Sequence, residues 1–212
     1  MTEADWNSSG DPGQLLKHIE KQSPSGTPYR KLALLLAACV DQCDDSAAFN
    51  ATAVELASHW ADGNAVTVPE WEHVSELGRR AQPVPTAATF LEAVRYLAAH
   101  RASGLRWSML RYVRSSVGWL RSGKARIVAR CHLIRDIFGN PFAPVAFDPS
   151  WRTEAVVGLS RGMYEARDFA PMPVLADALE DAGCAHPDVL AHCRGGPHVR
   201  GCWVVDLVLG KA

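Results

Sequence analysis

The chain has no long apolar run, no excess of charge of one sign and no signature of a familiar catalytic site. Its longest apolar stretch, residues 32–40, is far shorter than the roughly 20 residues that cross a bilayer, so we expect no membrane partner. The N-terminus is polar and acidic without an apolar segment, which predicts a cytoplasmic protein. The formal net charge of −1 excludes a chain that is basic throughout, so attraction to an anionic partner would require local clustering of basic residues.

Strand signals are also scarce, whereas helix signals recur from end to end. Period-two alternation is nearly absent, and the one candidate strand is residues 202–209, where Val204 and Val205 favour extended structure. Caps, prolines and apolar spacing instead predict helices, and for residues 199–209 helix is the preferred alternative. The predicted helices cover residues 12–22, 29–43, 46–61, 86–102, 105–138, 153–166, 173–182, 187–193 and 199–209, with short ones from residues 2 and 67. The sequence therefore predicts an all-α multi-helix bundle.

One segment interrupts the helical pattern strongly enough to mark a boundary. Residues 139–149 read GNPFAPVAFDP, and their three prolines remove amide donors and restrict the preceding residues. We therefore predict a helical bundle over residues 1–138 and a smaller helical C-terminal part over residues 139–212. The connector leaves two alternatives open, since the two parts could be separate or could pack as one unit.

The C-terminal third carries a resemblance. The runs RDIFGNPFAPVAFDP from Arg135, ADALEDAGC from Ala176 and HVRGCWVVDL from His198, with MTEADW at the N-terminus, resemble an uncharacterised planctomycete-type bacterial family. The resemblance implies a small multi-helical protein. It implies no activity, ligand or catalytic residue.

Cysteine and histidine are concentrated near the C-terminus. Six cysteines could form three disulfides in an oxidising compartment, but free thiols are expected in the cytoplasm. Zinc prefers four thiolate or imidazole ligands, and the candidate set is Cys184, Cys193, His198 and Cys202. Only His198 and Cys202 have the typical ligand spacing, while His192 and Cys193 are adjacent on a predicted helix, so their side chains diverge by about 100°. The alternative is that the thiols are buried hydrophobes, the histidines cap helices, and there is no cofactor.

Basic residues cluster in one segment. Between Arg95 and Arg135 the sequence has nine arginines and one lysine but no acidic residue. Guanidinium groups interleaved with aromatic rings are what phosphate contact and base stacking need. The candidate residues for binding nucleic acid or an anionic surface are Arg106, Arg111, Arg114, Arg121 and Arg126. The alternative is that arginine stems cover apolar surface and pair with carboxylates inside the protein.

Enzyme signatures are weak by comparison. We expect no G-x-S-x-G nucleophile elbow, no Walker loop and no Rossmann glycine fingerprint after a strand. Arg95 with His100, and Arg126 with His132, resemble the helical spacing of HEPN-type ribonucleases, although chance produces such pairs in an arginine-rich helical chain. We therefore expect a non-enzymatic helical adaptor or structural protein that binds another macromolecule, most simply a protein. Nucleic-acid binding and a zinc-stabilised C-terminal domain are the alternatives.

Overall fold

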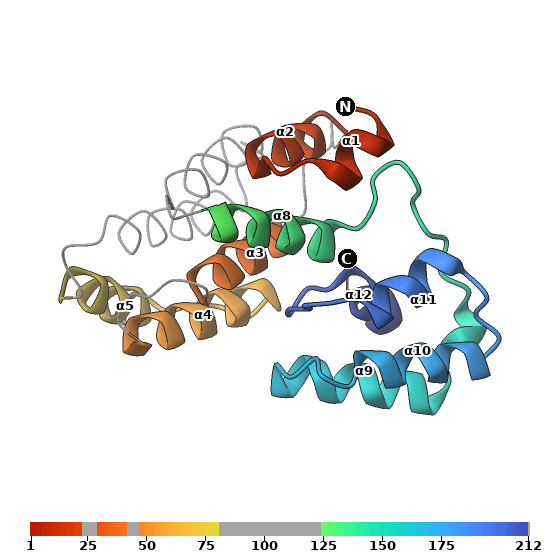
Figure 1. Ribbon diagram of the computed structural model, residues 1–212. Helices are drawn as coiled ribbons and strands as arrows, with labels where there is room; N and C mark the ends of the chain where they lie inside the picture. Colours follow the sequence, from red (N-terminus) through yellow and green to blue (C-terminus); the bar gives the residue numbers. More distant parts are fainter. Residues whose placement is uncertain (23–28, 42–46, 81–123, 212) are drawn as a thin grey trace. The chain divides into compact units, whose positions relative to one another are not determined.

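The computed structural model describes residues 1–22, 29–41, 47–80 and 124–211. Every regular element in these ranges is a helix, so the all-α prediction is confirmed (Figure 1). None of the helices in these ranges combines the length and the apolarity that crossing a membrane requires. The helix predicted over residues 86–102, and the part of the 105–138 helix before residue 124, lie outside the described ranges.

The chain divides into two compact units, Met1–Ile134 and Arg135–Ala212. The division falls inside helix α8 (Lys124–Phe138), a few residues before the boundary that the prolines suggest. The last turn of α8 therefore belongs with the C-terminal unit. This turn carries Asp136, whose side chain is buried.

The N-terminal unit begins with the predicted capping box. The Thr2 hydroxyl accepts a hydrogen bond from the Asp5 amide at 3.2 Å, and the Asp5 carboxylate accepts one from the Thr2 amide at 2.8 Å. Helix α3 packs against α4, and α4 packs against α5. The helices of this unit, besides the start of α8, are α1 (Glu3–Ser8), α2 (Pro12–Gln22), α3 (Tyr29–Asp41), α4 (Ala47–Ala61) and α5 (Val68–Arg80). As its all-round apolarity predicts, α3 buries nearly all of residues 32–40.

The C-terminal unit starts with the proline-rich connector, which has no helix over residues 139–148. It continues with the 3₁₀ turn η1 (Pro149–Trp151), α9 (Glu154–Ala166), α10 (Met172–Asp181), α11 (Pro187–Arg194) and α12 (Trp203–Leu209). Helix α9 packs against α10 and α12, and α11 also packs against these two helices (Figure 1). Their inward faces form one core that contains Leu175, Leu179, Val189 and three buried cysteines.

The candidate strand at residues 202–209 is helical. Val204, Val205 and Val208 are all buried, and positions i, i+1 and i+4 share one side of a helix. Packing thus outweighs the strand preference of valine. The end of α12 is held by Arg152, whose guanidinium donates to the carbonyls of Val208 at 3.0 Å and Leu207 at 2.9 Å.

Candidate metal centre

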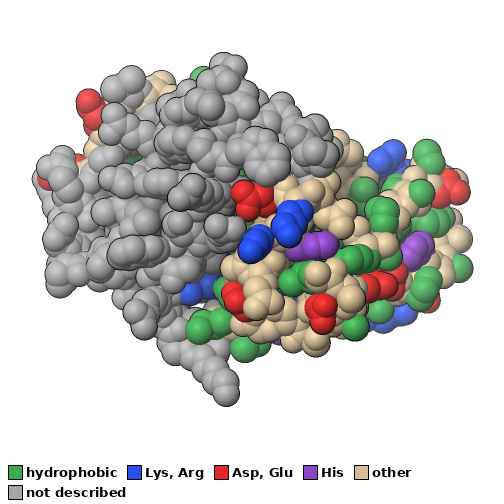
Figure 2. Space-filling view, turned by 90° about the horizontal axis from the view of Figure 1, so that it is seen from above, with side chains coloured by type: hydrophobic (Ala, Val, Ile, Leu, Met, Phe, Trp, Pro, Cys, Tyr) green, Lys and Arg blue, Asp and Glu red, His purple; other side chains and the backbone are tan. Residues whose placement is uncertain are grey.

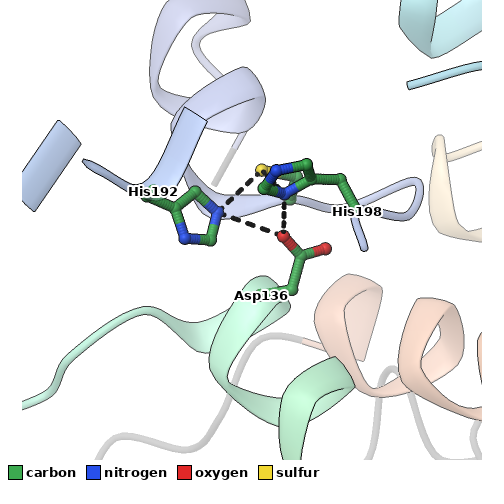
Figure 3. Close-up of side chains that lie close together, drawn as sticks. Asp136, His192 and His198 are labelled. Atoms are coloured by element: carbon green, nitrogen blue, oxygen red, sulfur yellow. Dashed lines mark hydrogen bonds and ion pairs between the residues drawn. The ribbon is translucent and has the colours of Figure 1, made fainter. Parts of the chain in front are cut away.

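Four side chains of the types that bind metals meet in the C-terminal unit. They are Asp136 at the end of α8, His192 on α11, His198 in the loop after α11, and Cys202 immediately before α12 (Figure 3). One donor atom from each residue lies within 4.8 Å of the other three. Cys202 lies in the core of the C-terminal unit, as does Cys193 next to His192, whereas Asp136 comes from the last turn of α8.

The carboxylate of Asp136 is the centre of the cluster. One of its oxygens, Oδ1, lies 2.7 Å from Nδ1 of His198 and 3.1 Å from Nε2 of His192. The other oxygen, Oδ2, accepts a hydrogen bond from the Val199 amide at 2.9 Å. The Asp136 side chain is only 3% exposed. One oxygen therefore fixes the orientation of the carboxylate and the other faces both histidines.

The sulfur of Cys202 completes the group. It lies 3.2 Å from Nε2 of His192 and 3.9 Å from Nδ1 of His198, and the residue is fully buried. In a tetrahedral zinc site, bonds of about 2.0–2.1 Å to nitrogen and oxygen and about 2.3 Å to sulfur place the donor atoms about 3.3–3.6 Å apart. The observed separations of 2.7, 3.1, 3.2 and 3.9 Å lie on both sides of this range. These are four of the six separations, and all six are within 4.8 Å, so the donor atoms would have to shift by several tenths of an ångström to bind one ion in a tetrahedron.

Both ring nitrogens of His198 face acceptors, so a positive charge, either a second ring proton or a metal ion, is needed between His198 and Asp136. Nε2 of His198 lies 3.1 Å from the Gly195 carbonyl oxygen, which can only accept, so Nε2 carries the proton. In the neutral ring, Nδ1 then presents a lone pair to the Asp136 oxygen at 2.7 Å. Two acceptors at that distance repel unless a cation joins them. A proton on Nδ1 would satisfy that one contact, whereas a metal ion would satisfy all four donor atoms together.

Burial and charge act in opposite directions on the two acidic groups. Burial raises the pKa of Asp136, but hydrogen bonds and positive charge from His192 and His198 outweigh it and hold the pKa below its usual value. Burial raises the pKa of the Cys202 thiol well above its usual value, and the Asp136 charge raises it further. A carboxylate and a thiolate would together neutralise a divalent ion, which is the arrangement that a buried ion requires.

Apolar and ring contacts surround the cluster. The ring of His192 lies 4.8 Å from the His198 ring and 5.0 Å from the Trp203 ring, measured between centroids. Trp203 in turn lies against Gly139, which ends α8 with φ of +69°; a Cβ atom at this glycine would be 3.3 Å from Cγ of Trp203. Gly139 thus gives both the left-handed turn and the space that Trp203 needs behind His192.

The structure brings together two of the four metal ligands predicted from the sequence. His198 and Cys202 belong to the cluster, whereas Cys184 and Cys193 are buried in the helical core and do not belong to it. The argument that His192 and Cys193 diverge holds, but His192 is the residue that faces the cluster. Asp136 and His192 were missed. A carboxylate in the last turn of a helix opposes the helix dipole, and this was the available signal for Asp136.

Most of the arginines predicted to bind nucleic acid or an anionic surface lie outside the described residues. Arg106, Arg111, Arg114 and Arg121, with the ribonuclease-like pair Arg95 and His100, lie outside the described residues. Arg126 lies on α8, and its side chain is likewise not described; His132 on the same helix is exposed. On the described part of the surface in Figure 2, basic, acidic and apolar side chains are interspersed.

One serine of the C-terminal unit, Ser160, has the glycine spacing of a hydrolase nucleophile but not the structural setting. The expectation of no G-x-S-x-G run is wrong, because Gly158, Ser160 and Gly162 form one. All three lie within helix α9, however, and no strand precedes them in the described chain. Ser160 is fully buried, and its hydroxyl has no hydrogen-bond partner among the described residues. An elbow requires an exposed serine on a strand-to-helix turn, so this segment is a helix that packs closely.

Comparison with protein-family models, with curated proteins and with solved structures gives no match for this chain. The resemblance to a planctomycete-type family therefore stays a prediction. The function proposed below therefore rests on the geometry of Asp136, His192, His198 and Cys202.

Proposed function

We propose that residues 135–212 form a zinc-binding helical unit in which the ion, held by Asp136, His192, His198 and Cys202, stabilises the fold. The observation that carries this proposal is the convergence of four donor atoms, of three chemical kinds, within 4.8 Å of one another. Two imidazoles, a thiolate and a carboxylate suit zinc, which is borderline-soft and four-coordinate. Calcium and magnesium prefer shells made only of oxygen, so this ligand set disfavours them.

The number of protein ligands favours a structural role. Catalytic zinc sites keep one position for water or substrate, whereas structural sites use four protein ligands. Three of the four side chains here are at most 5% exposed, which also limits access by substrate. A structural ion goes well with the non-enzymatic, protein-binding role that the sequence predicts. The partner itself stays a prediction.

Metal analysis of the purified full chain tests the proposal. With zinc supplied during expression, we expect about one ion per chain, in accordance with a single four-ligand site. Removing the ion by a chelator should lower the unfolding temperature of the C-terminal unit. At a free zinc concentration of about 100 Kd the ion contributes about 2.7 kcal/mol, equivalent to roughly 10–20 °C in a unit of this size. A stoichiometry near zero would overturn the proposal.

A matched pair of cysteine variants locates the site. Cys202 and Cys193 are both fully buried in the same core, yet only Cys202 belongs to the cluster. We expect Cys202→Ala to abolish zinc binding and Cys193→Ala to retain about one ion per chain. Equal loss in both variants would indicate that the cysteines act through packing and would contradict the proposed ligand set.

A further inference from the structure

The four ligands differ in how firmly the protein holds them. Three of them have a second anchor besides the cluster. The second oxygen of Asp136 accepts from the Val199 amide at 2.9 Å, and the second nitrogen of His198 lies 3.1 Å from the Gly195 carbonyl oxygen. Cys202 is fully buried immediately before α12. Ligands that are fixed in this way hold a metal more tightly than free ones.

His192 has no comparable anchor. Its Nε2 faces Asp136 and Cys202, and no described residue hydrogen-bonds its Nδ1. Figure 3 shows this second nitrogen turned away from Asp136 and His198. The ring is held in place by packing against Trp203 and His198, which is a weakly directional contact. With 20% of its side chain exposed, His192 is also the most accessible of the four ligands.

The helix that carries His192 would remain in position if the imidazole left. Val189 and Cys193 of α11 are fully buried, and Arg194 forms ion pairs with Asp177 and Glu180 of α10. Loss of the His192 imidazole from the cluster would therefore leave α11 held by the core and by α10. The vacated position would be a slot of the size of an imidazole beside Trp203, open to solvent on the side where His192 is exposed.

We infer that His192 is the exchangeable ligand of this site, and that an external imidazole nitrogen can take its place on the ion. This inference rests on the proposed zinc function. Asp136, His198 and Cys202 would then retain the metal, with two anionic ligands balancing the dication. The His192 position would be the only corner through which a ligand from solvent reaches the ion among the four described here, so the site can accept a donor from outside the chain.

Cobalt substitution with two glycine variants tests the inference. Cobalt(II) reports its coordination through its visible absorption, and the full-length protein is used throughout. We expect His192→Gly to retain about one cobalt per chain with an altered spectrum, and millimolar imidazole to restore the wild-type spectrum. His198→Gly is the matched control, because this ring is only 5% exposed and its slot is closed. We expect it to lose the ion and to show no rescue by imidazole.

The outcomes separate the two proposals. If wild-type protein binds neither zinc nor cobalt, the proposed function fails. If wild-type protein binds metal but His192→Gly loses it as completely as His198→Gly does, or if imidazole leaves the His192→Gly spectrum unchanged, the exchangeable-ligand inference is overturned and the zinc proposal stands. Circular dichroism of each variant identifies loss of fold. If His192→Gly is unfolded, a wild-type cobalt spectrum that does not respond to imidazole overturns the inference, and one that responds supports it.

Discussion

At the scale of single residues, Asp136 is the most informative side chain of the molecule. It is 3% exposed, lies in the last turn of α8 and has its negative charge at the end of the helix where the dipole disfavours it. A carboxylate in this position is costly unless positive charge compensates it. His192, His198 and the proposed ion supply that compensation.

Replacing Asp136 by asparagine removes the negative charge of this side chain and leaves its shape nearly unchanged. Asp136→Asn retains an oxygen that can accept from the Val199 amide but removes the anionic ligand. We expect zinc affinity to fall roughly 100-fold or more, which exceeds what loss of a supporting hydrogen bond costs. Competition with a chromophoric chelator measures the change. Asp188→Asn, at an exposed position on α11, is the control and should bind as the wild type does.

Gly139 offers a second test at this scale. Its φ is +69°, and a Cβ atom would lie 3.3 Å from Cγ of Trp203. Left-handed backbone costs roughly 1–2 kcal/mol for a residue with a side chain, so Gly139→Ala should lower the free energy of unfolding by at least about that amount. Urea unfolding followed by circular dichroism measures it.

The control for this variant is an alanine substitution at a second glycine, where we expect the free energy of unfolding to rise. Gly162 lies within α9, and a Cβ atom there would contact nothing within 4 Å. Gly162→Ala should therefore raise the free energy of unfolding by about 0.5–1 kcal/mol, because alanine loses less backbone entropy in a helix. If both variants were equally stable, the space beside Trp203 would not be the reason for Gly139.

Two of the four cluster residues could be predicted from the sequence because they lie close together along the chain. His198 and Cys202 are four residues apart, and spacing alone identifies them as a possible ligand pair. Asp136 lies more than fifty residues earlier in the chain, and no local pattern connects it with them. For His192 and Cys193, helical geometry shows that only one of them can face a given ion. Helical geometry does not show whether His192 or Cys193 faces the ion, because this depends on which side of α11 packs against the core.

At the scale of elements, helix starts were predicted well because their causes are local. The helices predicted from residues 2, 12 and 153 begin at Glu3, Pro12 and Glu154, after a capping box, at a proline and after a threonine cap, and each of these signals depends on neighbouring residues. Helix α12 was the difficult case. Its valines favour strand locally, and only burial against α9 and the rest of the core gives them a helical arrangement.

The capping box of α1 predicts a dependence on pH. The hydrogen bonds from the Thr2 amide and hydroxyl lower the pKa of Asp5 below its usual value. Its pKa is therefore lower in the folded state than the unfolded value of about 3.9. The box should contribute fully above the unfolded pKa and lose its contribution as the pH falls through the folded pKa.

Titration of Asp5 by NMR measures this directly. We expect a midpoint below the usual aspartate value in the wild type. Thr2→Ala retains the amide and removes the hydroxyl, so its midpoint should move partway back toward the usual value. A midpoint at or above the usual value in the wild type would show that the box does not form in solution.

At the scale of the whole molecule, the four proposed metal ligands all belong to one of the two compact units. Asp136, His192, His198 and Cys202 lie within Arg135–Ala212, and none comes from Met1–Ile134. The prolines of the connector predicted a boundary between residues 138 and 139, whereas the compact units divide between Ile134 and Arg135, inside α8. The assignment of the last turn of α8 required the structure, since it depends on contacts made by Asp136 and not on the helix itself.

Metal removal should consequently act on one unit. We expect chelation to reduce amide hydrogen-exchange protection in α9 to α12, and to leave α3 and α4 unchanged, because local stability follows the contacts of each unit. Exchange followed by mass spectrometry resolves the two. A uniform loss of protection along both units would mean that the ion stabilises the chain as a whole.

The distance along the chain between the first ligand and the other three has a mechanical consequence. An ion bound to Asp136 and to residues 192–202 closes a ring of polypeptide that contains the connector, α9 and α10. A protease that cuts the connector once, for example at the exposed Ala146, opens this ring without separating its ends. The two fragments should therefore migrate together under native conditions and separate far more readily once the ion is chelated. The bound metal would thus hold the two fragments of a cut chain together reversibly.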